Sequence, residues 1–317
     1  MMCKRFFTIV LLALAFVGAA ANEGAAADKR VLMLLWRGMT EPDAAFLNRL
    51  KTLEANAETV VLDSNQDRDT LSRHLRELSG DIESGKFDAI YSFGTTATRV
   101  TTNFVKDRIP VVFNVVFDPV EAQLVQAMER PGANVTGVTN GVPIADQFDA
   151  FQRLLPLKSM IVLFNPKEPN SNMIVEQVAQ WGLAHGVQII PRRVGPASPA
   201  LDETLEEIKT GSLRAEALYA GADSYLSTKA DAIKAAVGDR IPLLGGTQSY
   251  TANGWLAAYA PTLVDMGVAA AGVADRILKG ADARTLPVVL PQPKLVVSKA
   301  AAAIHSITVP ADALLEN

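Results

Sequence analysis

Polar side chains directly follow two of the short apolar runs in this chain. Gly94-Thr95-Thr96 follows Phe93 and opens a helical pattern, so unpaired backbone N–H groups and two hydroxyls could hold a carboxylate. Asp223 follows a second run and could accept hydrogen bonds from an ammonium group. Each motif has a simpler interpretation as a helix N-cap with no ligand. Together the two motifs predict a clamp for both charges of an amino acid.

Further candidates lie in other loops that follow strand-like runs. Trp36 offers a stacking face and Arg37 can hold an anion with two hydrogen bonds, which leaves open a ligand with an additional acidic group. Two prolines stiffen the loop 165–171, which favours a preorganised binding element, although a plain surface turn is the alternative. Asp118 either faces the ligand or caps the segment that follows it. The predicted ligand-binding residues are Trp36, Arg37, Gly94, Thr95, Thr96, Asp118, Asn140, Glu168, Asn170, Asp223, Ser224, Gly246 and Thr247.

The spacing of apolar residues predicts two α/β units. Short apolar runs alternate with helical patterns, and the alternation restarts after residue 159. Strands separated by helices indicate parallel sheets, in which ligands bind at the carboxyl ends of the strands. We interpret 109–171 as the hinge, with a helix at 120–128 and a polar loop at 134–143. The predicted strands include 31–35, 60–62, 89–93 and 111–116 in the first unit and 160–164, 187–190, 217–220 and 242–244 in the second.

The composition is that of an ordinary globular chain. With 317 residues, 49% hydrophobic content and 20% charged content, the chain is long enough for two domains. The net charge of −4 gives no reason to expect nucleic acid as a partner. All three histidines lie in or beside predicted helices, and no nucleophile elbow, phosphate loop or metal-ligand cluster occurs. We therefore expect no enzyme activity, no metal and no cofactor.

The N-terminus has the pattern of a secretory signal peptide. Two basic residues precede an apolar run from Phe6 to Val17, and small residues offer cleavage near Ala21 or Ala27. The run is shorter than the roughly 20 residues of a membrane span. Cys3, the only cysteine, precedes this run, where a lipoprotein cysteine would have to follow it. We predict a cleaved signal peptide and a periplasmic protein without disulfides or a direct membrane anchor.

Several motifs, in order along the chain, resemble those of one family. They are PVVFNVVFDPV, NVTGVTN, NPKEPNS, YAGADS, the segment 253–280 and ITVPADALL. These motifs are similar to those of ABC transporter substrate-binding proteins in the tryptophan/tyrosine-binding-like group. The resemblance implies a type 1 periplasmic binding protein fold: two Rossmann-like lobes with parallel sheets, joined by a multi-strand hinge. It also implies a ligand in the cleft between the lobes, an ABC permease in the inner membrane as partner, and a monomer.

The loop at Trp36 and Arg37 departs from the tryptophan-binding members, which often carry His and Pro there, so the ligand's identity stays open. After a signal peptide at 1–27, the resemblance places lobe 1 at 28–140 plus about 262–285. Lobe 2 is then expected at 141–261 plus about 286–317. The expected function is capture of an amino acid or related carboxylate for an ABC permease. A periplasmic sensor subunit that signals to a membrane receptor, and an exported α/β hydrolase, are the alternatives.

Overall fold

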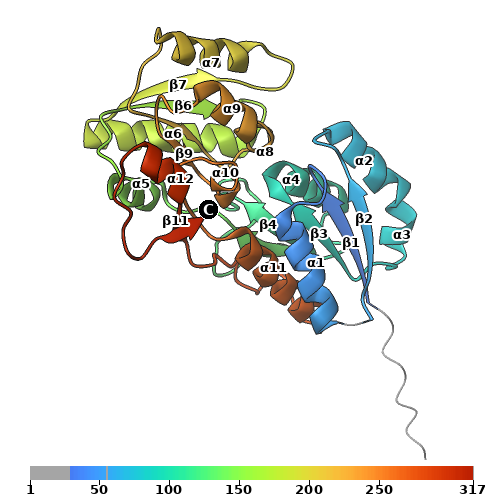
Figure 1. The fold of residues 1–317 in the computed structure, drawn as a ribbon. Helices are drawn as coiled ribbons and strands as arrows, with labels where there is room; N and C mark the ends of the chain where they lie inside the picture. Colours follow the sequence, from blue (N-terminus) through green and yellow to red (C-terminus); the bar gives the residue numbers. More distant parts are fainter. Residues whose placement is uncertain (1–28, 55, 317) are drawn as a thin grey trace, which may run out of the picture.

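The structure, a computed structural model, describes residues 29–54 and 56–316. Two α/β lobes lie side by side and are joined by several chain crossings (Figure 1). The predicted signal peptide, with Cys3 and both cleavage positions, lies outside the described residues. In the part of the chain that the structure describes, no helix is long and apolar enough to cross a membrane.

Lobe 1 is built on a parallel sheet whose strands are buried on both faces in its centre. Its strands are β1 (Arg30–Leu35), β2 (Glu58–Asp63), β3 (Ala89–Phe93), β4 (Val111–Val116) and β5 (Val135–Thr139). Its helices are α1 (Glu41–Leu53), α2 (Arg68–Glu77), α3 (Ser79–Glu83), α4 (Gly94–Val105) and α11 (Leu263–Leu278). Helices cover both faces of such a sheet, which explains its continuous apolar runs. The strand order is β2-β1-β3-β4-β5.

Lobe 2 repeats this plan and extends it at one edge. Its strands are β6 (Ser159–Phe164), β7 (Gln188–Arg193), β8 (Ala217–Ala220), β9 (Leu243–Gly245), β10 (Ala257–Ala260), β11 (Lys294–Ser298) and β12 (Leu314–Glu316). Its helices are α5 (Ile144–Gln152), α6 (Pro169–His185), α7 (Ala200–Thr210), α8 (Ser224–Thr228), α9 (Ala230–Val237), α10 (Gln248–Thr251) and α12 (Lys299–Ile304). The order is β12-β11-β10-β9-β8-β6-β7, and β10 with β11 is the antiparallel pair.

The two sheets place equivalent loops at equivalent positions. The order β7-β6-β8-β9-β10 in lobe 2 matches β2-β1-β3-β4-β5 in lobe 1. The loop after β1 therefore corresponds to the loop after β6, and the loop after β3 corresponds to the loop after β8. All four loops carry residues that were predicted to bind a ligand.

The C-terminal third crosses between the lobes more than once. Helix α11 lies along α1 (Figure 1) and contributes its buried side to the core of lobe 1. Leu286 and Val288 still belong to that core, and Val289 forms a β-bridge with Val138. Strands β11 and β12 then join the sheet of lobe 2. By these contacts, the chain leaves lobe 1 slightly beyond residue 285. We propose the predicted division of the rest of the chain into two lobes unchanged.

Three predicted elements are wrong. The helix expected at 120–128 is a series of turns, because Gln123 has a φ of 58°, which interrupts the helical repeat. The expected polar loop at 134–143 contains β5. The threonines and the glycine of this strand interrupt its apolar pattern, so the sequence did not indicate a strand. The helix expected over 224–237 is broken at Lys229 into α8 and α9.

Candidate functional site

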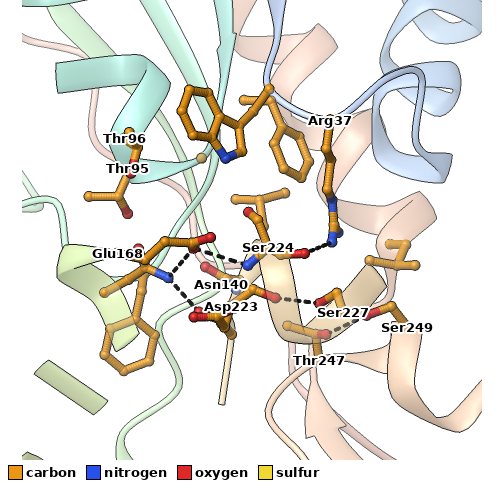
Figure 2. Close-up of a pocket in the computed structure, with 18 residues that line it drawn as sticks. Arg37, Thr95, Thr96, Asn140, Glu168, Asp223, Ser224, Ser227, Thr247 and Ser249 are labelled. Atoms are coloured by element: carbon orange, nitrogen blue, oxygen red, sulfur yellow. Dashed lines mark hydrogen bonds between the residues drawn. The ribbon is translucent and has the colours of Figure 1, made fainter. Parts of the chain in front are cut away.

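A pocket between the lobes brings together most of the predicted site residues (Figure 2). Its empty volume is about 530 Å³, including space open to solvent. Arg37 of lobe 1 donates a hydrogen bond to lobe 2 here, so the lobes are close together around the pocket. Eleven of the thirteen predicted residues line this pocket: Trp36, Arg37, Gly94, Thr95, Thr96, Asn140, Glu168, Asn170, Asp223, Ser224 and Thr247.

The other two predicted residues do not line this pocket. The Asp118 carboxylate accepts hydrogen bonds from the backbone N–H groups of Val120 and Glu121, at 3.0 and 2.9 Å, which is the capping alternative. Gly246 packs behind the pocket wall, where a Cβ would lie 2.8 Å from the backbone nitrogen of Ala222. That glycine therefore permits close packing of two loops.

Sequence reasoning missed seven residues that line the pocket: Phe93, Val115, Phe117, Ala222, Ser227, Ser249 and Leu263. The apolar ones have the same pattern as core residues, so no signal in the sequence separates them from the core. Val115 is a special case, since its φ is 58° and the register of β4 shifts between Asn114 and Val116. A β-branched residue is strained in this conformation, and such strain is often found at functional sites.

The lobe 1 side of the pocket is the start of α4. No side chain caps this helix, so its first N–H groups point toward the pocket without a side-chain acceptor. The φ of Gly94 is 78°, a conformation that favours glycine, and it turns the chain from β3 into the helix. Thr95 and Thr96 are buried, and Thr96 Oγ1 has no hydrogen-bond partner. This helix end can therefore bind an anionic group.

The lobe 2 side of the pocket presents Asp223. Its Oδ1 accepts a hydrogen bond of 2.7 Å from the backbone N–H of Leu226, so it is the N-cap of α8. Its Oδ2 has no partner, although the residue is only 3% exposed. Burial, followed by the nearby charge of Glu168, raises the pKa of Asp223 to about 8. Asp223 is thus a helix cap with one carboxylate oxygen left available for a hydrogen bond.

Glu168 holds the same short helix from another loop. Its two carboxylate oxygens accept hydrogen bonds from the backbone N–H groups of Ser224 and Tyr225, at 3.0 and 3.2 Å. Asn170 donates to the backbone carbonyl of Ala222. Burial raises the pKa of Glu168, while these hydrogen bonds lower it. The loop 165–171 therefore fixes the segment that carries Asp223.

Arg37 reaches across from lobe 1. Its Nη1 donates a hydrogen bond of 3.2 Å to the backbone carbonyl of Ser224, and its guanidinium lies over the ring of Phe93, 5.4 Å from the centroid. Burial lowers the pKa of Arg37, and the charges of Glu168 and Asp223 are among those that raise it again. Figure 2 shows Arg37 directed at the segment that carries Ser224.

Unpartnered polar atoms collect in this pocket. Asn140 is 2% exposed, yet both its Nδ2 and its Oδ1 lack partners. Three further buried atoms also lack a hydrogen-bond partner: Arg37 Nε, Thr96 Oγ1 and Asp223 Oδ2. Leaving buried polar groups unpaired is costly, so donors and acceptors in one small space indicate a site for a polar ligand. Among the described residues, no group of three or more His, Cys, Asp or Glu side chains could hold a metal ion.

Comparisons with known proteins identify relatives. The chain is 26% identical over 215 residues to a tyrosine-binding protein of Clostridioides difficile, and the match covers 67% of this chain and 61% of that protein. The structure superimposes on the ABC domain in complex with L-Trp from Streptococcus pneumonia with a TM-score of 0.79, at 22% identity, covering 91% and 99% of the two chains. A conserved domain protein from Vibrio cholerae gives a TM-score of 0.80, at 24% identity and the same coverage.

These structural neighbours confirm the predicted fold class, two α/β lobes of the type 1 periplasmic binding protein fold. A family described as "ABC transporter substrate binding protein" matches residues 46–317. Since this match covers both lobes, the chain belongs to the ABC transporter substrate-binding protein family.

Proposed function

We propose that this protein works in the periplasm, where it captures an α-amino acid, an aromatic one as the first candidate, in the interlobe pocket and delivers it to an ABC permease in the inner membrane. The family supports a binding role. The aromatic class is supported by one relative named as a tyrosine-binding protein and by a structural neighbour that holds L-Trp.

The observation that carries the proposal is the pairing of charges across the pocket. The start of α4, with Thr96 Oγ1, offers donors for a carboxylate. Asp223 Oδ2 offers an acceptor for an ammonium group, and Asn140 offers one donor and one acceptor. An amino acid carries both complementary charges. The aromatic side chains of Trp36 and Phe93, which also line the pocket, offer a surface for an aromatic ring.

Closure of the two lobes completes the site. The anion-binding donors belong to lobe 1 and Asp223 belongs to lobe 2, so a ligand that touches both stabilises the closed arrangement over the open one. The closed form is then the form that the permease recognises. Capture and delivery require no chemical change of the ligand.

The test is a titration of the chain from Asp28 onward by calorimetry. The ligands are aromatic amino acids, the same molecules without the amino group, the same molecules without the carboxyl group, small dicarboxylates and sugars. We expect an amino acid to bind best and each truncated analogue to lose roughly 10- to 100-fold in affinity, as for a lost hydrogen bond to a charged group. Equal affinity for an acid without an amino group would contradict the proposal.

The transport role has its own test. Deleting the gene should reduce uptake of the labelled ligand by the cell, and restoring the gene should restore it. Unchanged uptake with a lost response to the ligand would instead favour the sensor alternative.

A further inference from the structure

Two arginines of lobe 1 donate hydrogen bonds to backbone carbonyls of lobe 2. Arg37 Nη1 binds the carbonyl of Ser224, and Arg68 Nη2 binds the carbonyl of Lys167, each at 3.2 Å. The Arg37 bond is partly buried within the pocket, whereas the Arg68 bond is exposed. Glu168 lies next to Lys167 in sequence and binds the N–H of Ser224, so it is adjacent to both contacts.

The Ser224 carbonyl is held in place by Glu168. Helix α8 has only five residues, too few to be stable alone. The Glu168 carboxylate binds the first two N–H groups of this helix, and both its oxygens are used in doing so. Glu168 therefore fixes the peptide group whose oxygen receives Arg37. Its oxygens are committed to the backbone of its own lobe, unlike Asp223 Oδ2.

The Arg37 guanidinium is held by the protein at two places. Its Nη1 donates to the backbone carbonyl of Ser224, and the ring of Phe93 covers one of its faces. Burial lowers the pKa of Arg37, and the nearby charges of Glu168 and Asp43 are among those that raise it again.

We propose that Arg37 and Glu168 are positioning residues that together form an interlobe latch, which stabilises the closed form, while ligand selectivity resides in Asp223, Asn140 and Thr96. The inference rests on the proposed function and refines it. It assigns two of the residues predicted from the sequence as ligand contacts to lobe closure.

The test uses Arg37→Gln and Glu168→Gln, with Arg68→Gln as the matched control. Each protein is titrated with the best amino acid and with its analogue lacking the amino group, and interlobe distances are measured by pulsed dipolar spectroscopy. A latch stabilises the closed complex of every ligand alike. We expect Arg37→Gln to weaken the two ligands by the same factor, roughly 10- to 100-fold, and both latch variants to populate more open distances. Glu168→Gln should also weaken both ligands, but with a changed ratio between them, because the charge of Glu168 raises the pKa of Asp223. Arg68→Gln should change affinity less than about threefold, since its bond is exposed to water.

A changed ratio between the two ligands in Arg37→Gln would overturn the latch, because it would show direct ligand contact. Unchanged affinity in both latch variants would also overturn it. Circular dichroism and thermal melting establish that each variant is folded, and Arg37→Lys, which keeps a donor and the charge, should recover part of the loss. If the wild-type protein binds no amino acid, the proposed function fails. The latch is then judged from the ligand-free distances, which must shift toward open forms in both variants.

Discussion

The loop after β3 in lobe 1 and the loop after β8 in lobe 2 occupy the same place in the two sheets, yet they have opposite electrostatic character. In lobe 1 the helix α4 starts with no side-chain cap and leaves donors free. In lobe 2 the helix α8 is capped by Asp223 and held by Glu168, so its donors are used and a carboxylate oxygen is left over. The duplicated architecture thus places free donors on one side of the pocket and a free carboxylate oxygen on the other, and we propose these as its anion-binding end and its cation-binding end.

The loops after the first strand of each sheet show the same contrast. The loop after β1 carries the cation Arg37, and the loop after β6 carries the carboxylate of Glu168. These two groups meet through the backbone of Ser224. This contrast supports our proposal that one pair of loops selects the ligand while the other pair joins the lobes.

The largest loss of ligand affinity is expected when the proposed cation-binding end is removed. Asp223→Asn removes the charge that faces the ligand's ammonium group but keeps an oxygen able to cap α8. We expect affinity for the amino acid to fall by roughly 10- to 100-fold in calorimetry. The analogue without the amino group should bind the variant at least as well as it binds the wild type. An equal loss for both ligands would mean that Asp223 acts on folding or closure instead.

The pH dependence of ligand affinity tests the role of Asp223 in a second way. Because the pKa of Asp223 is raised to about 8, an ammonium ligand must displace a proton from it at neutral pH. Affinity should therefore rise with pH by up to about tenfold per unit until Asp223 is ionised, and then level off. Calorimetry in two buffers with different ionisation enthalpies should detect the released proton, and Asp223→Asn should abolish both effects. A pH-independent affinity between pH 6 and pH 8 would contradict this role.

The same shift affects the ligand-free protein. A carboxyl group with a raised folded-state pKa stabilises the fold when protonated, and this contribution is lost as the pH rises through the folded pKa. The free energy of unfolding should therefore decrease as pH approaches about 8, relative to Asp223→Asn, in denaturant titrations. A wild-type protein whose stability rises over this range relative to the variant would oppose the assignment.

A smaller loss of ligand affinity is expected from a change at the proposed anion-binding end. Thr96→Val removes a hydroxyl that has no partner in the protein, while the backbone donors of α4 stay in place. We expect a loss of about 2- to 10-fold in affinity, the range for one neutral hydrogen bond. The analogue without the carboxyl group should be insensitive to this change, and a matching loss for that analogue would count against the assignment.

The smallest effect on binding is expected at Asp118. Asp118→Asn changes a residue outside the pocket, so affinity should stay within the error of the titration. Loss of part of its capping of Val120 and Glu121 should lower the free energy of unfolding by about 1 kcal/mol or less. A clear loss of affinity would return Asp118 to the list of ligand contacts.

The fold was predictable from the sequence to the extent that each element has its own local pattern. Buried apolar runs located β1, β4 and β6, and the spacing of apolar residues gave the bounds of α11. Strand β5 was missed because Thr136 and Gly137 interrupt its apolar pattern; the Thr136 hydroxyl is satisfied by the backbone carbonyl of Leu286, 150 residues away. Such a distant partner leaves no local signal.

The site was predictable where polar residues follow strands, because parallel sheets collect such residues at one edge. The apolar wall was not, since Phe117 and Leu263 have the pattern of core residues. The exact role of each polar residue also depends on contacts between distant segments. Glu168, for example, is committed to the backbone of residues 224 and 225.

The most direct test of the central claim is a crystal structure of the protein with the amino acid that binds best. We expect the ligand's ammonium group within hydrogen-bond distance of Asp223 Oδ2 and its carboxylate at the start of α4, with Arg37 still bound to the carbonyl of Ser224. A ligand in the reverse orientation, with its carboxylate on Arg37 and no contact to Asp223, would contradict it.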